Sequence, residues 1–512
     1  MADENRILEK TIREKVEVDT GLLENAYVKP SDFYAPYVEL PYYHGLLRNV
    51  DVAELLARPG EFLLRFAMPT TPTGPMRPFL SVYPVGSKSK DEIVHIEITT
   101  AEGKYTVETG GTFDTVALLV THYQTEKKSV HPTASALLNK PAKRHRWQLR
   151  NYLLKMERKL GEGTFAQVNR GILRVRAKER EVAIKICREN EKITKEQMLN
   201  EVMKEVHIMK PLRHRHVVRL YGVAMDYEPI MIVMELVRGG SLQRYLRKNP
   251  GKIPTLEKLE RMILGAACGI QYIHEKTLIH RDIAARNCLY SKDICKISDF
   301  GLACVGESFK LKVVCKVPFK SMAPEVFCTF RYTPKSDVYA FGVMIWEIFM
   351  DGKEPYPDKR LPEVKAMVVS GARLTFPDTT PPEIKEMTNT CCWATNPDDR
   401  LTMAQIVRKL DEFIHKYVNE LSRSKSDNIE EDVEPGEPPR NSAAHLANVL
   451  DRSRETADKT EDKTDHKDKT VDCEISTYST MSVVGEPSQV GSLSSPAQLS
   501  KKGKPSSKRK KN

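Results

Sequence analysis

The chain has 512 residues, which is too long for one ordinary hydrophobic core and predicts two domains with tails. Hydrophobic residues make up 40% of it and charged residues 29%, and no stretch is apolar enough to cross a bilayer, which excludes an integral membrane protein and a wholly disordered chain. The net charge of +11 favours anionic partners such as phosphates, acidic peptides or inner-leaflet lipid, and is too small an excess to indicate nucleic acid.

The first residues are charged, and they lack both the apolar run of a secretory signal and the glycine that myristoylation needs. The ten cysteines fall almost entirely between Cys187 and Cys392, without paired zinc-ligand spacing, which is typical of reduced thiols. We therefore expect a cytoplasmic protein without a transmembrane segment. Recruitment to the inner face of the plasma membrane stays open, and composition does not fix the oligomeric state.

Residues 1–41 are polar and end in a run rich in Pro and Tyr, so we expect a short, weakly ordered N-terminal arm. From residue 42 to residue 140 the pattern predicts a small antiparallel sheet between two helices. Residues 141–152 are expected to form a basic linker that carries Trp147. The helices are expected at residues 51–57 and 112–122, and the strands at 61–66, 79–83 and 93–98.

Residues 153–415 first read as strands around one helix and then as mainly helices, with the longest helical signal at 336–350, which predicts a two-lobed α+β domain. Residues 422–512 are rich in Ser, Thr, Pro, Lys, Asp and Glu, and they cannot bury enough apolar surface to offset chain entropy. They predict a disordered tail. Its basic end, residues 501–512, could bind anionic lipid, direct nuclear import or simply keep the tail soluble.

A glycine-bearing turn begins the second domain and would let backbone amides approach nucleotide phosphates. On this fragment alone an ordinary hairpin turn is an equally good interpretation. The third glycine of such a phosphate-binding turn is replaced here by Ala166. The segment runs Leu160-Gly161-Glu162-Gly163-Thr164-Phe165-Ala166-Gln167-Val168.

Lys185 follows on an apolar strand, where burial is costly unless the ammonium meets an anion. The phosphates of ATP are such an anion. Glu205 on the next helix is expected to pair with Lys185, and Glu201, one turn earlier, is the alternative.

The most specific segment is His280-Arg281-Asp282-Ile283-Ala284-Ala285-Arg286-Asn287, followed seventeen residues beyond the aspartate by Asp299-Phe300-Gly301. Phosphoryl transfer needs a carboxylate that orients the acceptor and ligands for Mg²⁺. Asp282 suits the first role. Asn287 and Asp299 suit the second, because Mg²⁺ prefers a few hard oxygen ligands completed by water and phosphate.

In these motifs the chain resembles the eukaryotic protein kinase family, over about residues 153–413. The resemblance implies ATP as the cofactor, with Mg²⁺, and a catalytic set of Lys185, Glu205, Asp282 and Arg286. It also implies a nucleotide site formed by Leu160, Gly161, Gly163, Val168, Ala183, Lys185, Glu235 and Leu236.

Three further positions match fold-supporting elements of that family. The resemblance implies a structural ion pair between Glu325 and Arg400, and it implies that Asp337 orients the catalytic loop. The run Ala284-Ala285-Arg286 has the tyrosine-kinase form, and Pro318 resembles the proline that shapes the peptide platform. Ser321 stands where that family has tryptophan, so substrate docking is expected to differ.

Residues 42–140 resemble a Src-homology-2 (SH2) domain in Tyr43-His44-Gly45, in Gly60-Glu61-Phe62-Leu63-Leu64-Arg65 and in a later-strand histidine. Arg65 is the expected phosphotyrosine ligand, because a guanidinium holds phosphate oxygens bidentately. The resemblance adds His95, with Arg48 as a substitute contact. Asn49 stands at the usual helix arginine and Ala67 at the usual hydroxyl residue, so weak binding is expected.

An SH2 domain directly before a tyrosine kinase domain is similar to the arrangement of the Fps/Fes/Fer family. The shortened plan is similar to that of the small Fer-like kinases of nematodes. It implies a non-receptor tyrosine kinase in intracellular signalling, which transfers the γ-phosphate of ATP to tyrosine in protein substrates and is recruited through its SH2 domain to phosphotyrosine-containing proteins. Peripheral membrane association would come through partners or the basic tail. The alternative is a weakly active or inactive kinase that serves as a phosphotyrosine-binding scaffold.

The segment between Asp299 and Glu325 contains no tyrosine, and Phe309 stands at the position equivalent to the family's phosphorylation site. We therefore predict activity that does not depend on phosphorylation of this loop. It would be either constitutive and modest, or gated by contacts with the SH2 domain through Trp147.

Overall fold

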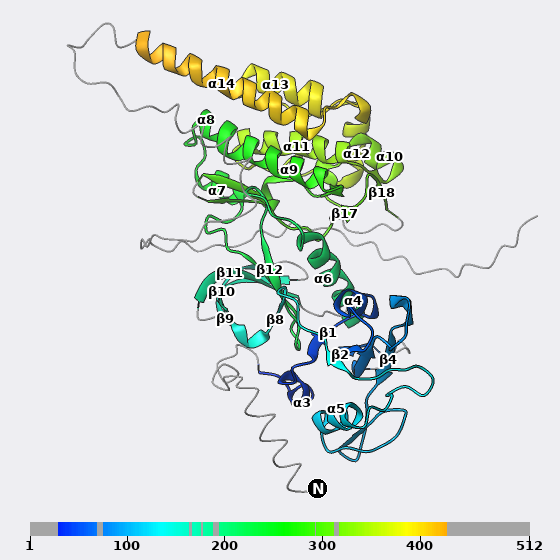
Figure 1. Ribbon diagram of the computed structural model, residues 1–512. Coiled ribbons are helices and arrows are strands. Elements are labelled where there is room, and N and C mark those ends of the chain that lie inside the picture. Colours follow the sequence, from blue (N-terminus) through cyan, green and yellow to red (C-terminus); the bar gives the residue numbers. More distant parts are fainter. Residues whose placement is uncertain are drawn as a thin grey trace, which may run out of the picture.

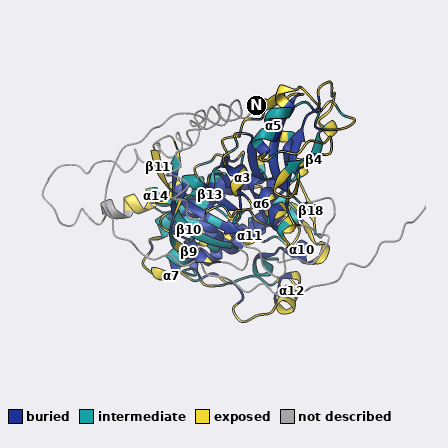
Figure 2. Cartoon of the chain, turned by 90° about the horizontal axis from the view of Figure 1, so that it is seen from below, coloured by how far each residue is buried: buried dark blue, intermediate teal, exposed yellow. Residues whose placement is uncertain are grey.

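The computed structural model describes residues 29–68, 75–162, 166–175, 178–187, 194–291, 293–311 and 317–427. Figure 1 shows three parts in succession: an N-terminal unit, a lobe built on a six-stranded sheet, and a helical lobe. In Figure 2 buried residues fill the interior of each part, and exposed residues concentrate on outer elements such as α12. None of the helices in these described ranges is long and apolar enough to span a membrane.

The N-terminal unit, residues 29–142, has a sheet of order β1-β2-β3-β4, with β7 also beside β2. The three predicted strands form antiparallel pairs, but β1 and β7 run parallel to β2, so the expectation of a wholly antiparallel sheet was wrong at these positions. The elements are β1 (Tyr43–Leu46), α4 (Asn49–Leu55), β2 (Glu61–Ala67), β3 (Arg77–Val82), η1 (Lys90–Glu92), β4 (Val94–Glu97), β5 (Thr99–Ala101), β6 (Lys104–Thr106), α5 (Val116–Thr125) and β7 (Lys140–Pro141).

Two boundaries in this unit differ from the prediction because of capping. Helix α5 begins at Val116 rather than at residue 112, because the Thr115 hydroxyl accepts a hydrogen bond from the Leu118 amide and fixes the N-cap. Helix α4 begins two residues earlier than predicted, with Asp51 accepting a hydrogen bond from the Arg48 amide at its first turn.

The predicted weakly ordered arm was wrong where the structure describes it, whereas residues 1–28 lie outside the described residues. Residues 29–41 contain α3 (Ala35–Val38), and Tyr34 and Tyr37 are buried there. Both rings lie edge-on to Phe66 of β2, with centroids 4.9 Å apart in each case. Aromatic burial of this size offsets the entropy of ordering a short segment.

The predicted linker is also part of the folded structure. Its end carries β8 (Gln148–Leu149), which pairs in parallel with β12 (Leu220–Ala224) of the next lobe. The Lys210 ammonium lies 5.4 Å from the centre of the Trp147 ring, a cation–π contact that fixes the tryptophan against the lobe.

The second lobe has a sheet of order β8-β12-β13-β11-β10-β9. Helix α6 begins with a capping box formed by Thr194 and Gln197. The helix buries one face, which carries Met198, Val202 and Val206. The elements are η2 (Asn151–Leu153), β9 (Leu154–Glu162), β10 (Ala166–Val175), β11 (Lys178–Cys187), α6 (Lys195–Met209), β12 and β13 (Met231–Glu235).

The helical lobe is built around α11 (Pro334–Phe349), which is buried from Ser336 to Phe349 and is therefore a core helix. The other elements are α7 (Leu242–Lys248), α8 (Thr255–Glu257), η3 (Lys258–Leu264), α9 (Gly265–Glu275), β14 (Leu278–Ile279), η4 (Ala285–Asn287), β15 (Cys288–Ser291), β16 (Ile294–Ile297), β17 (Cys304–Val305), β18 (Phe309–Lys310), η5 (Phe319–Ser321), α10 (Pro324–Thr329), β19 (Arg331–Tyr332), α12 (Leu361–Val369), α13 (Pro382–Met387), η6 (Thr388–Cys392), η7 (Pro397–Asp399) and α14 (Met403–Asp427).

Helix α14 packs against α9 and continues to Asp427, so the prediction of disorder from residue 422 was wrong for 422–427. The apolar face that holds the helix on the core ends near Val418, and the last turns propagate the helix already formed. Residues 428–512, the rest of the predicted tail, lie outside the described residues.

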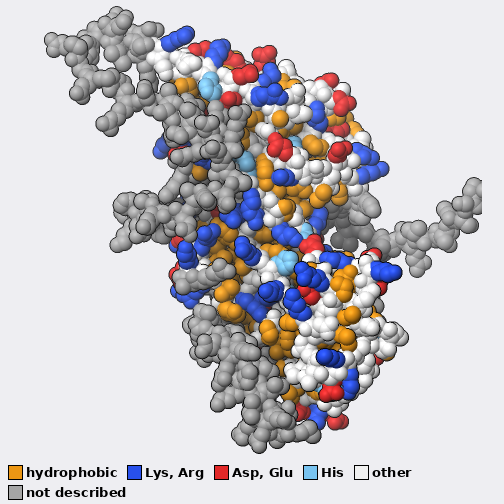
Figure 3. Space-filling model, in the orientation of Figure 1, with side chains coloured by type: hydrophobic (Ala, Val, Ile, Leu, Met, Phe, Trp, Pro, Cys, Tyr) orange, Lys and Arg blue, Asp and Glu red, His pale blue; other side chains and the backbone are white. Residues whose placement is uncertain are grey.

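The surface charge is uneven on the face seen in Figure 3. Lys and Arg side chains gather over the middle of the molecule, where the N-terminal unit meets the six-stranded lobe. Acidic side chains are more frequent over the helical lobe.

Candidate active site

The lysine of strand β11 is paired with the glutamate predicted for it. Lys185 Nζ lies 2.8 Å from both carboxylate oxygens of Glu205 on α6, whereas Glu201 is exposed. Burial alone would lower the pKa of Lys185, but the carboxylates of Glu205 and Asp299 outweigh it and raise the pKa. The ammonium therefore stays charged at neutral pH.

Asp299 brings a second carboxylate to the same ammonium, with Oδ1 3.8 Å from Lys185 Nζ. Its backbone has φ = 61°, a left-handed conformation that aspartate tolerates better than most residues. The next residue, Phe300, is buried against the ring of His280, 5.0 Å between centroids. Burial opposes ionisation of Asp299, yet the charge of Lys185 outweighs it and lowers the pKa.

The catalytic-loop residues lie together before β15. Arg286 donates a hydrogen bond to the carboxylate of Asp282, and the Asn287 side-chain amide donates to the Asp282 carbonyl at 2.8 Å. That bond uses the nitrogen of the amide, so the amide oxygen is the atom that can coordinate a cation. A carboxylate, an amide oxygen and room for phosphate match the ligands that Mg²⁺ prefers.

Helix α11 holds the catalytic loop in place through two buried carboxylates. Asp337 accepts hydrogen bonds from the backbone amides of His280 at 2.8 Å and Arg281 at 2.9 Å. Glu347 accepts one from the Ala285 amide at 2.8 Å. Burial raises the pKa of Glu347 to about 7, although the hydrogen bond from Ala285 acts in the opposite direction.

The expected nucleotide residues come from neighbouring strands of one sheet. Gly161 lies opposite Val168 in the β9–β10 hairpin. Ala183 lies opposite Met234 across β11 and β13. Leu160 precedes Gly161 on β9. Glu235 ends β13, and Leu236 begins the connection to the helical lobe. Gly163 lies outside the described residues.

The connection between the lobes needs a glycine at one position. A Cβ on Gly239 would lie 1.8 Å from the Tyr290 carbonyl oxygen of β15. Glu235, at the start of this connection, pairs with Lys296 of β16 at 3.1 Å. These contacts fix the sheet relative to the catalytic loop.

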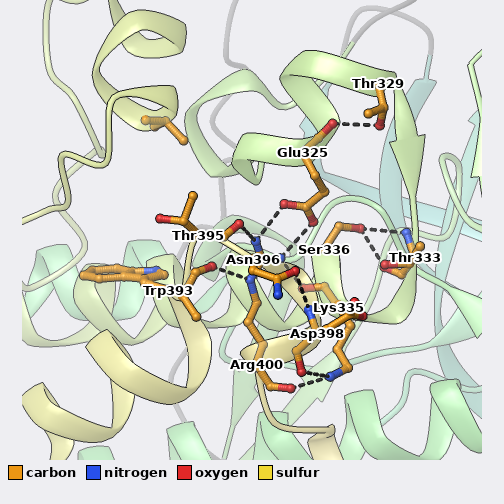
Figure 4. A network of polar contacts seen from close by, with 12 residues as sticks. Glu325, Thr329, Thr333, Lys335, Ser336, Trp393, Thr395, Asn396, Asp398 and Arg400 are labelled. Atoms are coloured by element: carbon orange, nitrogen blue, oxygen red, sulfur yellow. Dashed lines mark hydrogen bonds and ion pairs between the residues drawn. The ribbon is translucent and has the colours of Figure 1, made fainter.

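Glu325 and Arg400 form an ion pair within the network of polar contacts shown in Figure 4. Arg400 is fully buried and binds both carboxylate oxygens of Glu325, at 2.8 and 2.7 Å. It also donates to the carbonyls of Ala394 and Lys335, each at 2.9 Å. Because all these donors are used, the pair supports the fold between α10 and α14.

Two of the three expected phosphotyrosine residues meet in the N-terminal unit. Arg65 is fully buried, and it donates to Leu47 O at 2.7 Å, Asn49 Oδ1 at 2.6 Å and Ser81 Oγ at 2.8 Å. His95 Nδ1 lies 3.0 Å from the same Ser81 hydroxyl.

The electrostatics of this pair follow from burial. Burial lowers the pKa of Arg65 to about 10, and burial together with the Arg65 charge lowers the pKa of His95 to about 4. Arg65 is therefore the only charged member of the pair at neutral pH.

Arg48 is not brought to this pair. Its guanidinium binds both carboxylate oxygens of Asp51, at 2.7 and 2.8 Å, and Asn200 of α6 at 3.2 Å. Arg48 is therefore engaged by Asp51 of the helix that it precedes and by α6, rather than by the Arg65 cluster.

Sequence reasoning missed Ser81 and Glu347. Ser81 is a polar residue in an apolar strand, two residues after Phe79, which lies opposite Arg65. Side chains two residues apart on a strand lie on the same face, so this spacing could have indicated that Ser81 lies near Arg65. Glu347 is the acidic residue in the otherwise apolar stretch of α11 from residue 338 to residue 349, and its role depends on a contact 62 residues away in sequence.

Comparison with known proteins identifies the class. Residues 154–410 match the family model described as protein tyrosine and serine/threonine kinase. The chain therefore belongs to the protein kinase family.

Its relatives include Fer tyrosine kinases. Fer-related kinase 1 of Caenorhabditis elegans is 37% identical over 377 residues, which are 73% of this chain and 93% of that protein. Spermatocyte protein spe-8 of the same species is 35% identical over 320 residues, 62% of this chain and 60% of that protein. Human tyrosine-protein kinase Fer is 31% identical over 378 residues, 73% of this chain and 44% of Fer. The chain is a protein-tyrosine kinase related to the Fer and Fps kinases and to the short Fer-like kinases of nematodes.

Proposed function

We propose that this kinase transfers the γ-phosphate of ATP to tyrosine hydroxyls of protein substrates, as a non-receptor enzyme of intracellular signalling. The observation that carries the proposal is the linked set Glu205–Lys185–Asp299, which lies between a glycine-bearing hairpin and a loop that contains Asp282. A scaffold that had lost catalysis would have no need to keep these three charges paired.

Each residue of the set has a chemical role. Lys185 binds the α- and β-phosphates, and Glu205 fixes its position. Asn287 and Asp299 hold Mg²⁺, which neutralises charge on the phosphates when it is bound. Asp282 orients the acceptor hydroxyl, and Arg286 supplies positive charge beside it. The adenine and phosphates are held by the hairpin and by the end of β13.

Tyrosine rather than serine or threonine is the proposed acceptor. Arg286 approaches the Asp282 carboxylate from four residues further along the chain, where Ala284 and Ala285 leave room for a phenol ring. Incubation of the full chain with ATP, Mg²⁺ and an acidic tyrosine polymer tests this. Phosphotyrosine should be formed, and transfer only to a serine polymer would contradict the assignment.

We further propose that the N-terminal unit is an SH2 domain that recruits the enzyme to phosphotyrosine-containing proteins. The alignment with Fer-related kinase 1 covers 377 residues and so extends beyond residues 154–410. Arg65 has five N–H donors, of which three are used, so a phosphate must displace Asn49 or share the guanidinium with it. Recruitment of this kind places the enzyme in the cytoplasm, at the inner membrane face when its partners are there.

Calorimetry with a phosphotyrosine peptide library tests the reader proposal. Arg65→Leu should abolish binding while kinase activity is retained, because the lost charge-assisted bonds belong to a different unit from the catalytic loop. Arg77→Leu, which removes an exposed arginine from the neighbouring strand, should leave binding unchanged. Equal affinities of the wild type and Arg65→Leu would exclude this pocket.

A further inference from the structure

Arg281, the residue before the acceptor-orienting Asp282, lies between two aromatic rings. Its Cζ atom lies 4.2 Å from the centre of the Phe309 ring and 4.7 Å from the centre of the Tyr332 ring. The side chain is buried, and Nη1 donates to the Leu302 carbonyl at 2.9 Å. An arginine in this position is attracted to both ring faces, and the attraction is stronger where water is excluded.

The two rings belong to one antiparallel pair of short strands. Phe309 of β18 is directly opposite Tyr332 of β19, so both side chains lie on the same face. The residues before the two aromatic side chains are also bonded to each other, because the Ser308 hydroxyl accepts a hydrogen bond from Arg331 at 3.0 Å. The strand pair thereby joins the segment after Asp299 to the residues that lead into α11.

The backbone of Arg281 completes the connection. Its amide donates to Asp337 of α11, and its φ of 68° is a left-handed conformation that carries a steric cost for arginine. The guanidinium and the amide thus tie three parts of the lobe together at the residue before Asp282. Because Arg281 and Asp282 are joined by one peptide bond, a movement of the Arg281 guanidinium would also move the Asp282 carboxylate.

We propose that Phe309 and Tyr332 are positioning residues for phosphoryl transfer, which clamp Arg281 by cation–π contacts in place of a phosphate. In protein kinases this loop is ordered when a phosphorylated residue pairs with arginine. Phe309 carries no hydroxyl, and no tyrosine lies between Asp299 and Glu325, so here the rings supply the order without a modification.

The inference rests on the proposed transferase activity and is tested with the full chain, first treated with phosphatase. Phe309→Leu should lower kcat on a tyrosine polymer about tenfold, with KM for ATP changed less than twofold, because the nucleotide site is untouched. Phe309→Trp should restore kcat to within about twofold, since it keeps an aromatic face. Phe330→Leu is the matched control, an exposed phenylalanine in the same lobe, and should behave like the wild type.

A second measurement does not depend on catalysis. Amide hydrogen exchange in β17 and β18 should be faster in Phe309→Leu than in the wild type and in Phe330→Leu. Equal exchange and equal kcat in the two leucine variants would overturn the clamp, and so would a Phe309→Trp variant as impaired as Phe309→Leu. If the wild type had no transferase activity but exchange in β17 and β18 were still faster in Phe309→Leu than in the wild type, the clamp would be supported and the proposed function rejected.

Discussion

Several charged groups inside this kinase are held by groups of opposite charge or by hydrogen bonds. Lys185 is held by two carboxylates, Asp337 accepts three hydrogen bonds, and Arg65 donates to three acceptors. Desolvation of an unpaired charge costs several kcal/mol, so removal of the partner of one of these groups would be destabilising.

Glu347 is the buried carboxylate whose titration the structure most clearly shifts. Its pKa of about 7 lies above the value of an unfolded glutamate, so the folded state binds the proton more tightly. Stability from this group is therefore fully present below about pH 4.5 and is lost as pH rises through 7. Between pH 4.5 and pH 8 the free energy of unfolding of the wild type should fall by about 3 kcal/mol relative to Glu347→Gln. Urea denaturation at several pH values measures this, and parallel pH profiles would contradict it.

Among the elements, α10 and the segment before α14 depend on the Glu325–Arg400 pair. Glu325→Ala would leave a fully buried guanidinium without its carboxylate and should lower the free energy of unfolding by about 3–5 kcal/mol. Glu383→Ala, which removes an exposed partner of Lys416, should cost less than about 1 kcal/mol. Thermal denaturation of both variants provides the comparison, and equal midpoints would refute the structural role.

Prediction from the sequence succeeded where the signal is local. The strand with Arg65, the helix with Glu205 and the loop with Asp282 were placed because alternation, helical spacing or a short motif marks each of them. Helix α5 began later than predicted because a cap, rather than its apolar pattern, sets its start.

Contacts distant in sequence could not be predicted. The bond between Arg48 and Asn200 joins residues 152 positions apart, and it redirects an arginine that local reasoning assigned to phosphate. The packing of Tyr34 and Tyr37 has the same origin, since their aromatic partner Phe66 lies on a strand formed later in the chain.

At the scale of the whole molecule, the N-terminal unit and the six-stranded lobe share an interface. The Leu46 amide donates to the Met225 carbonyl at 2.8 Å, and the buried Asp226 binds Arg144 and Arg150. Gly45 lies in this contact with φ = 79°, and a Cβ there would lie 2.2 Å from the Met225 carbonyl oxygen. The interface therefore leaves no room for a side chain at residue 45.

Gly45→Ala should therefore separate the unfolding of the two parts. Calorimetry should give one cooperative transition for the wild type and two for the variant, of which only one is raised by an ATP analogue. Gly86→Ala is the control, because Gly86 also has a positive φ of 89° but open space around it. Two transitions in the wild type, or one in Gly45→Ala, would show that the contact does not couple the parts.

Asp282 orients the acceptor in the proposed phosphoryl-transfer site, and a steady-state assay of Asp282→Asn on a tyrosine polymer measures its contribution. We expect kcat to fall about 10²- to 10⁴-fold with ATP binding retained, because the carboxylate is lost while Lys185, Glu205 and the sheet are unchanged. Turnover close to that of the wild type would contradict it.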